Sequence, residues 1–172
     1  MNKRVIVDMD GVISDIYSQF LKYELDDLNI QQSLQDVTGK MEYEAFANCE
    51  KYLHSPDFFY DAPPIENSID VLEEINRKYD LFIVSAAVEY PLSLHEKVRW
   101  LDKHFPFIKW QQIVLCGSKQ PISGDVMIDD HFKNLDFFGG ETLLYSQPHN
   151  LERSEGRHKR VNSWEEIGGM LL

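Results

Sequence analysis

Cysteine, long apolar runs and positive charge are all scarce in this sequence of 172 residues. The two cysteines, Cys49 and Cys116, stand far apart and match no metal-ligand spacing, so we expect reduced thiols in a cytoplasmic protein. No apolar stretch approaches the ~20 residues that span a bilayer. The apolar run after the basic N-terminus stops at Asp8, too early for the core of a secretory signal. We therefore expect neither a membrane anchor nor secretion.

Basic side chains number 17 and acidic ones 29, which gives a net charge of −12. A charge of this sign argues against a nucleic-acid polymer or an anionic membrane as the main partner. An anionic small molecule would need local positive charge from a metal ion or a few placed lysines. The chain contains neither a P-loop nor a Gly-x-Gly-x-x-Gly sequence, so a triphosphate or dinucleotide site is unsupported. The hydrophobic fraction of 43% suffices for the core of one domain.

The most informative stretch is an apolar run that ends in two aspartates. Val5–Val7 are β-branched, which suits a strand buried on both faces. Asp8 and Asp10 follow, and Gly11 allows a sharp turn. With a side-chain period of two, both carboxylates can point the same way, and carboxylates held together require a cation or a shared proton. From these residues alone, a solvated pair of aspartates in a turn is an equally good interpretation.

Strand and helix patterns alternate along the rest of the chain. We expect strands at residues 3–8, 81–84, 112–116, 126–128, 142–145 and 159–162. We expect helices within 13–52, with a second one over 36–52 capped by Thr38, and then from Asn67 or Ser68, after Pro91 and after Ser163. This alternation predicts an α/β fold with a mainly parallel sheet and helices on both faces. The helical segment after the first strand would form a cap above the carboxyl edge of the sheet.

Polar side chains follow four of the expected strands, and parallel strands bring their carboxyl ends to one edge. These side chains are Asp8, Asp10, Ser85, Lys119, Asp129 and Asp130. Carboxylates are the hard oxygen ligands that Mg²⁺ prefers, whereas a lysine and a serine hydroxyl can bind a phosphate. The set therefore predicts a phosphate site inside an acidic protein. One carboxylate could attack as a nucleophile and form an acyl phosphate, while another moves protons.

These residues, in this order, resemble the four motifs of the haloacid dehalogenase (HAD) superfamily. Within it, the chain is similar to the 5′(3′)-deoxyribonucleotidase family. The stretches that carry the family resemblance are Asp8-Met9-Asp10-Gly11-Val12, Asp57-Phe58-Phe59 ahead of Pro63, Glu96-Lys97-Val98-Arg99-Trp100, Ile128-Asp129-Asp130 and Pro148-His149-Asn150. The resemblance implies a HAD-like Rossmannoid core, a three-layer αβα sandwich over residues 1–13 and 67–172. Residues 14–66 would form a small helical cap.

The resemblance also implies a role for each polar residue at the sheet edge. Asp8 would be the nucleophile, and Asp10 the general acid and base. Mg²⁺ would be held by Asp8, the Asp10 backbone carbonyl and Asp129, with support from Asp130. Ser85 and Lys119 would bind the phosphate. The chain departs from the family pattern at Ala86, Ala87 and Gly117. These departures bear on substrate preference more than on phosphatase chemistry.

The expected activity is Mg²⁺-dependent hydrolysis of (deoxy)nucleoside monophosphates through a phospho-aspartate, in a protein compatible with a homodimer. Ile16, Phe58 and Phe59 are candidates for contacts with the base, although packing of the cap onto the core explains the two phenylalanines equally well. A phosphatase or phosphotransferase acting on another small ester, such as a sugar phosphate, is the alternative. A phospho-accepting signalling receiver fits the residue types but not their order along the chain. A dehalogenase is disfavoured by Asp10, because a departing halide needs no general acid.

Overall fold

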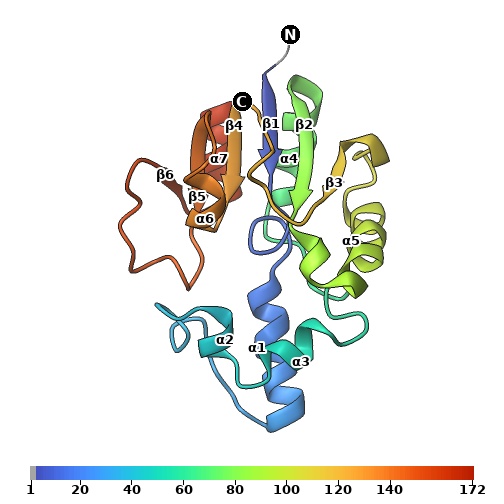
Figure 1. Ribbon diagram of the computed structural model, residues 1–172, viewed down its shortest axis with the longest axis vertical. Helices are drawn as coiled ribbons and strands as arrows, with labels where there is room; N and C mark the ends of the chain where they lie inside the picture. The colour runs from blue at the N-terminus through green and yellow to red at the C-terminus, as the bar shows by residue number, and fades with distance from the viewer. Residues whose placement is uncertain (1–2) are drawn as a thin grey trace.

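The computed structural model describes residues 3–172 and contains a six-stranded sheet (Figure 1). The strands are β1 (Arg4–Val7), β2 (Asp80–Ser85), β3 (Ile113–Leu115), β4 (Val126–Asp129), β5 (Glu141–Tyr145) and β6 (Lys159–Val161). Their order is β3-β2-β1-β4-β5-β6, and every neighbouring pair is parallel. The carboxyl ends of all six strands therefore lie along one edge, as the sequence predicted.

Strand β1 lies inside the sheet, which explains its unbroken apolar sequence. Val5 and Val7 point into one buried apolar cluster, whereas Ile6 between them points into another. The register pairs Val5 with Leu81 on one side and with Val126 on the other. Because successive side chains of a strand face opposite ways, burial on both faces requires every position to be apolar.

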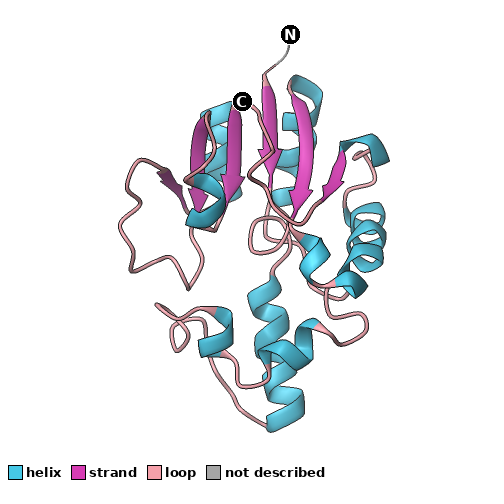
Figure 2. Cartoon of the chain, in the orientation of Figure 1, coloured by secondary structure: helices cyan, strands magenta, loops and turns pink. Residues whose placement is uncertain are grey.

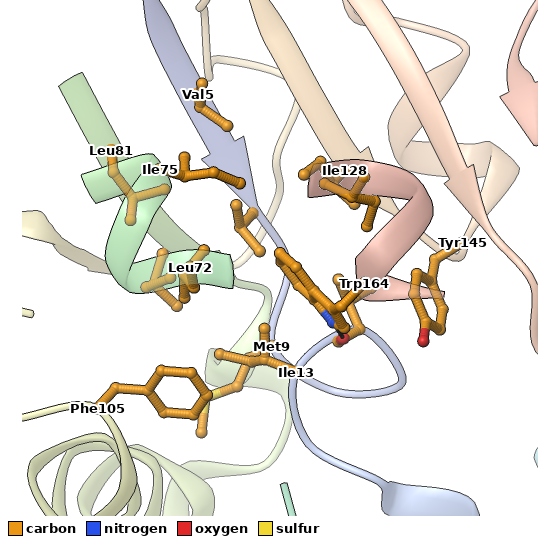
Figure 3. Close-up of a cluster of buried hydrophobic side chains, with 14 of the residues drawn as sticks. Val5, Met9, Ile13, Leu72, Ile75, Leu81, Phe105, Ile128, Tyr145 and Trp164 are labelled. Atoms are coloured by element: carbon orange, nitrogen blue, oxygen red, sulfur yellow. Dashed lines mark hydrogen bonds between the residues drawn. The ribbon is translucent and has the colours of Figure 1, made fainter. Parts of the chain in front are cut away.

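The helices form three groups around the sheet (Figure 2). They are α1 (Ile16–Leu28), α2 (Glu42–Ala45), α3 (Cys49–Leu53), α4 (Ser68–Lys78), α5 (Pro91–His104), α6 (Phe132–Leu135) and α7 (Trp164–Leu171), with 3₁₀ turns at Ala87–Glu89 and Trp110–Gln112. Helices α4, α5 and α7 pack on one face of the sheet and the short α6 on the other. Figure 3 shows Leu72 of α4 and Trp164 of α7 in the larger of these clusters. The α/β class with helices on both faces is confirmed.

Three expectations about helices differ from the structure. The helix expected over 36–52 is replaced by the short helices α2 and α3. Gly39 has φ 79° and Phe46 is extended (φ −118°, ψ 120°), so the backbone leaves the helical region twice. Thr38 caps no helix, because its hydroxyl donates to the Leu34 carbonyl (2.9 Å). Asn67 precedes α4 without a side-chain capping bond, whereas Ser163 does cap α7 and accepts from the Glu166 N–H.

Helices α1, α2 and α3 have an apolar core of their own at the carboxyl edge of the sheet (Figure 1). Its buried members are Ile16, Tyr17, Phe20, Val37, Phe46, Cys49, Tyr52, Phe58, Phe59 and Ala62. All of them fall within residues 14–66, so we retain the proposed division into that cap and a core of residues 1–13 and 67–172. Among the described residues, 3–172, no helix has the length and apolar character needed to cross a membrane.

The turn after β1 depends on Gly11. Its φ of 73° lies in the left-handed region, and its N–H donates to the Ser14 carbonyl (2.8 Å). The Asp130 carboxylate occupies the space that a Cβ atom would fill at this position. Glycine is therefore required twice, for the backbone conformation and for the close approach of a buried acid.

We predict that Gly11→Ala destabilises the fold by about 2 kcal/mol or more, from the left-handed strain and the contact with Asp130. Urea unfolding at an unchanged m-value measures this loss. Gly169→Ala is the matched control, since Gly169 lies within α7, and a Cβ there meets nothing within 4 Å. It should instead stabilise by ~0.5–1 kcal/mol. Equal stabilities for the two variants would contradict the requirement for glycine.

Candidate active site

The expected polar residues meet at the carboxyl edge of the sheet. Asp8 follows β1, Ser85 ends β2, and Lys119 lies in the loop after β3. Asp129 ends β4, and all four side chains are buried. A pocket of about 400 Å³ between this edge and the cap is lined by residues of both. Its wall includes Asp8, Asp10, Ser85, Lys119 and Asp130 from the core and Ile16, Phe20, Glu42 and Phe59 from the cap.

Lys119 neutralises two of the buried acids. Its Nζ lies 2.5 Å from Asp8 Oδ1 and 2.6 Å from Asp129 Oδ2. Burial opposes its charge, but the two carboxylates outweigh that cost and raise the pKa of Lys119, which keeps it protonated. Burial raises the pKa of Asp8 to about 7, opposed by Lys119 and reinforced by Asp129 and Asp10. With this pKa, the Asp8 carboxylate is readily protonated near pH 7 unless further positive charge is added.

Asp129 is the most completely bonded of the acids. Its Oδ1 accepts from the His131 backbone N–H (2.9 Å), and Asn134 Nδ2 donates to both oxygens (3.0 and 3.1 Å). Asn134 was not predicted from the sequence. It lies on α6, the helix that directly follows β4, so its place five residues after Asp129, in the first turn of that helix, is the signal that could have found it.

Lys97 of α5 is a further site residue that sequence reasoning missed. Its buried Nζ lies 2.5 Å from Asp10 Oδ2 and 2.9 Å from Ser85 Oγ. It therefore connects the second aspartate to the end of β2. The signal was periodicity, since Lys97 stands four residues from the buried Ser93 and from the buried Leu101, on the face of α5 that packs inward.

Three carboxylates form a cluster that fits a divalent cation. Asp8, Asp129 and Asp130 each offer an oxygen within 4.8 Å of the others. Asp130 Oδ1 is buried and has no hydrogen-bond partner among the described residues. Burial and the neighbouring carboxylates raise the pKa of Asp130 well above its usual range. These raised pKa values mean that one ammonium supplies too little positive charge to keep all three acids ionised, and oxygen donors of this kind suit a hard divalent ion.

The Asp10 carboxylate does not belong to this cluster, because it pairs with Lys97. The expectation that its backbone carbonyl binds the metal stays a prediction.

The cap residues divide into two groups. Ile16 and Phe59 line the pocket. Phe58 is fully buried in the cap and does not line it, since its ring packs against Phe20 and Tyr23 with centroids 4.9 and 5.0 Å apart. Of the two interpretations of Phe58, its burial therefore favours packing of the cap over contact with a base.

Comparisons with known proteins agree with this geometry. Residues 2–172 match the family model described as 5′ nucleotidase, deoxy (pyrimidine), cytosolic type C protein. The chain is 37% identical over 175 residues to a 5′(3′)-deoxyribonucleotidase of Bacillus subtilis, with 100% of both chains covered. It is 33% identical over 173 residues to a putative 5′(3′)-deoxyribonucleotidase of Staphylococcus epidermidis, covering 96% of this chain and 93% of the relative.

Solved structures of low identity share the fold. The putative HAD-hydrolase YfnB from Bacillus subtilis, bound to magnesium, superposes with a TM-score of 0.64 at 16% identity and covers 99% of this chain and 98% of its own. A HAD family hydrolase from Deinococcus radiodurans, with bound phosphate and sodium, gives 0.59 at 18% identity, with 99% and 98% covered. These structures show that the chain has the fold of HAD hydrolases. The family model and the full-length relatives show that the chain belongs to the 5′(3′)-deoxyribonucleotidase family of phosphomonoester hydrolases.

Proposed function

We propose that the protein is a Mg²⁺-dependent phosphatase of deoxyribonucleoside monophosphates that works through a phosphorylated Asp8. The observation that carries the proposal is that two neighbouring aspartates have different contacts. Asp8 contacts Lys119 and belongs to the acidic cluster, whereas Asp10 contacts Lys97 and does not. The names of the full-length relatives support the substrate class.

Asp8 is the proposed nucleophile. Its carboxylate attacks the phosphorus atom, the bond from phosphorus to the ester oxygen breaks, and an acyl phosphate forms. Lys119, paired with Asp8 in the absence of substrate, is placed to contact the phosphoryl oxygens when they arrive. Attack by water on the acyl phosphate then releases inorganic phosphate and restores the Asp8 carboxylate.

Asp10 is the proposed general acid and base. Its Oδ2 is held by Lys97, while its buried Oδ1 has no partner among residues 3–172. The carboxyl group gives a proton to the departing ester oxygen and takes one from the attacking water. Proton transfer of this kind contributes ~10²–10⁴-fold to the rate.

The metal and the phosphate share the acidic edge. Asp8 and Asp129, with the Asp10 carbonyl and support from Asp130, would hold Mg²⁺, whose charge would offset that of the phosphoryl oxygens. Ser85 and Lys119 are the proposed phosphate-binding side chains, and Lys97 joins them because it already contacts Ser85. Three polar groups from three segments thus surround the position proposed for the phosphoryl group.

The cap supplies the proposed nucleoside side of the pocket. Ile16, Phe20 and Phe59 form an apolar part of the pocket wall, and the Phe59 ring lies beside Lys97, whose Nζ is 4.6 Å from the ring centroid. A base can stack on such a wall, where each aromatic contact is worth ~1–3 kcal/mol. A sugar phosphate has no comparable apolar face, so this wall favours a nucleotide.

Two further expectations remain proposals. Cys49 and Cys116 are both free thiols, which suits a cytoplasmic location. A homodimer also stays a prediction.

We predict that Asp8→Asn lowers kcat for deoxyuridine monophosphate by at least ~10³-fold, since the amide cannot form the acyl phosphate. Rapid acid quenching with ³²P-labelled substrate should label the native protein and not the variant. Asp102→Asn, an exposed change on α5, is the control and should keep native turnover. Labelling of the Asp8→Asn variant would show that the nucleophile lies elsewhere.

The proton-transfer role predicts a different defect for Asp10→Asn. An aryl phosphate with a good leaving group needs no acid in the first step but still needs a base for the second. The variant should therefore release about one equivalent of phenolate in a burst and then turn over ~10²–10⁴-fold more slowly. Stopped-flow absorbance measures both phases. A uniformly slow reaction without a burst would remove the proposed division of roles.

The substrate class is tested with a panel of phosphate esters, with Mg²⁺ and after its removal by a chelator. We expect kcat/KM to be highest for deoxyuridine and thymidine monophosphates, lower for their ribose counterparts, and lowest for sugar phosphates. All activities should vanish without the metal and return when it is added back. Activity confined to sugar phosphates would contradict the nucleotidase function and leave the phosphatase chemistry intact.

A further inference from the structure

A second group of potential metal ligands lies in the wall of the pocket. It consists of Glu42 from α2 of the cap, His131 at the start of α6 and His149 after β5, and the proposed hydrolysis uses none of them. One donor atom from each lies within 4.8 Å of the donor atoms of the other two. Glu42 and His131 line the pocket, and His149 is buried behind them.

A hydrogen bond at Nε2 fixes the orientation of the His149 ring. Nε2 lies 3.0 Å from the Asp130 backbone carbonyl, which can only accept, so Nε2 must carry the hydrogen. In the neutral ring, the lone pair of Nδ1 is then left facing Glu42 Oε1, 3.4 Å away. A histidine that donates one N–H to a backbone carbonyl and presents its other nitrogen is the usual arrangement of a metal ligand.

A neutral His149 ring leaves this group one hydrogen short. The Tyr17 hydroxyl lies 2.6 Å from Glu42 Oε1 and 2.9 Å from His149 Nδ1, and its single hydrogen can serve only one of these two acceptors. A proton on His149 Nδ1 or a metal ion would remove the conflict, and only a metal ion would also engage His131.

The spacing and chemistry of the donors match zinc. Zinc bonds to nitrogen and oxygen are ~2.0–2.2 Å long, so two ligands at a tetrahedral angle stand about 3.3 Å apart. The distance of 3.4 Å between His149 Nδ1 and Glu42 Oε1 already has this value. The His131 ring stacks on His149 (centroids 4.3 Å apart, 16° between planes). Because the lone pairs of an imidazole lie in the plane of its ring, the His131 ring must turn out of this stack for one of its nitrogens to reach the ion. Two imidazoles and one carboxylate are a donor set for zinc rather than magnesium.

We propose that Glu42, His131 and His149 bind one Zn²⁺ ion, separately from the acidic cluster, and that this ion fastens the cap to the core. Glu42 is the only ligand from the cap, and the two histidines belong to loops of the core. The ion would therefore close the side of the pocket that α2 covers. The fourth position on zinc remains for water or for a substrate group.

Calorimetric titration of the whole protein with Zn²⁺, in excess Mg²⁺ to fill the acidic cluster, tests the proposal. We expect one zinc site in the native chain. Glu42→Gln and His131→Ala should each weaken it by at least the ~10–100-fold that changes in outer-shell partners cost. His95→Ala, which removes an exposed histidine of α5, is the matched control and should bind as the native chain does. Asp8→Asn should also bind zinc normally.

Two outcomes would overturn the proposal. One is the absence of a zinc site in the native chain. The other is a site that survives Glu42→Gln and His131→Ala but is lost in Asp8→Asn, which would place zinc in the acidic cluster. Circular dichroism of each variant checks that it is folded, and His131→Gln replaces His131→Ala if the latter is not. An anomalous-scattering map of zinc-soaked crystals should show the ion between the three side chains, and density elsewhere alone would contradict the assignment.

Discussion

Three buried carboxylates around one buried ammonium are the constraint on which the rest of the structure depends. Asp8, Asp129 and Asp130 are taken out of water at the edge of the sheet, and Lys119 can offset only part of their charge. Removing charges from water is costly unless each is paired or hydrogen-bonded. The rigid parallel strands hold the acids in place against their repulsion. The shortage of positive charge, seen in the raised pKa values of Asp8 and Asp130, is what makes this edge suitable for a divalent cation.

Helix α5 links the acidic edge of the sheet to the cap. Glu96 accepts hydrogen bonds from the backbone N–H groups of Asp57 (2.8 Å) and Phe59 (3.1 Å), both in the cap. The next residue, Lys97, contacts Asp10 and Ser85 in the core. Trp100, one turn further, donates to the Ala62 carbonyl (2.7 Å). A single helix therefore contacts the end of the cap and places a cation beside the second aspartate.

The predictions from the sequence succeeded where backbone geometry alone decides the outcome. A strand alternates its side chains and a parallel sheet aligns its strand ends, so the meeting of Asp8, Ser85 and Asp129 follows from element type and order. The predictions were incomplete for helices and turns. Lys97 and Asn134 reach the site because of how α5 and α6 are rotated against the sheet, and packing sets that rotation. The long helix expected over 36–52 was wrong because a positive φ at Gly39 cannot be inferred from apolar spacing.

The sequence by itself determined the parallel sheet and the acidic pair after β1. The order of its motifs also indicated the family to which the chain belongs. Each of these depends on neighbours along the chain, whose spacing is fixed by covalent geometry. The tertiary structure alone decided that Asp8 and Asp10 have different cationic partners, Lys119 and Lys97. It alone brought Glu42 of the cap to His131 and His149 of the core. Those contacts join residues far apart in the chain, and their distances are set by how the cap packs on the sheet edge rather than by any local pattern.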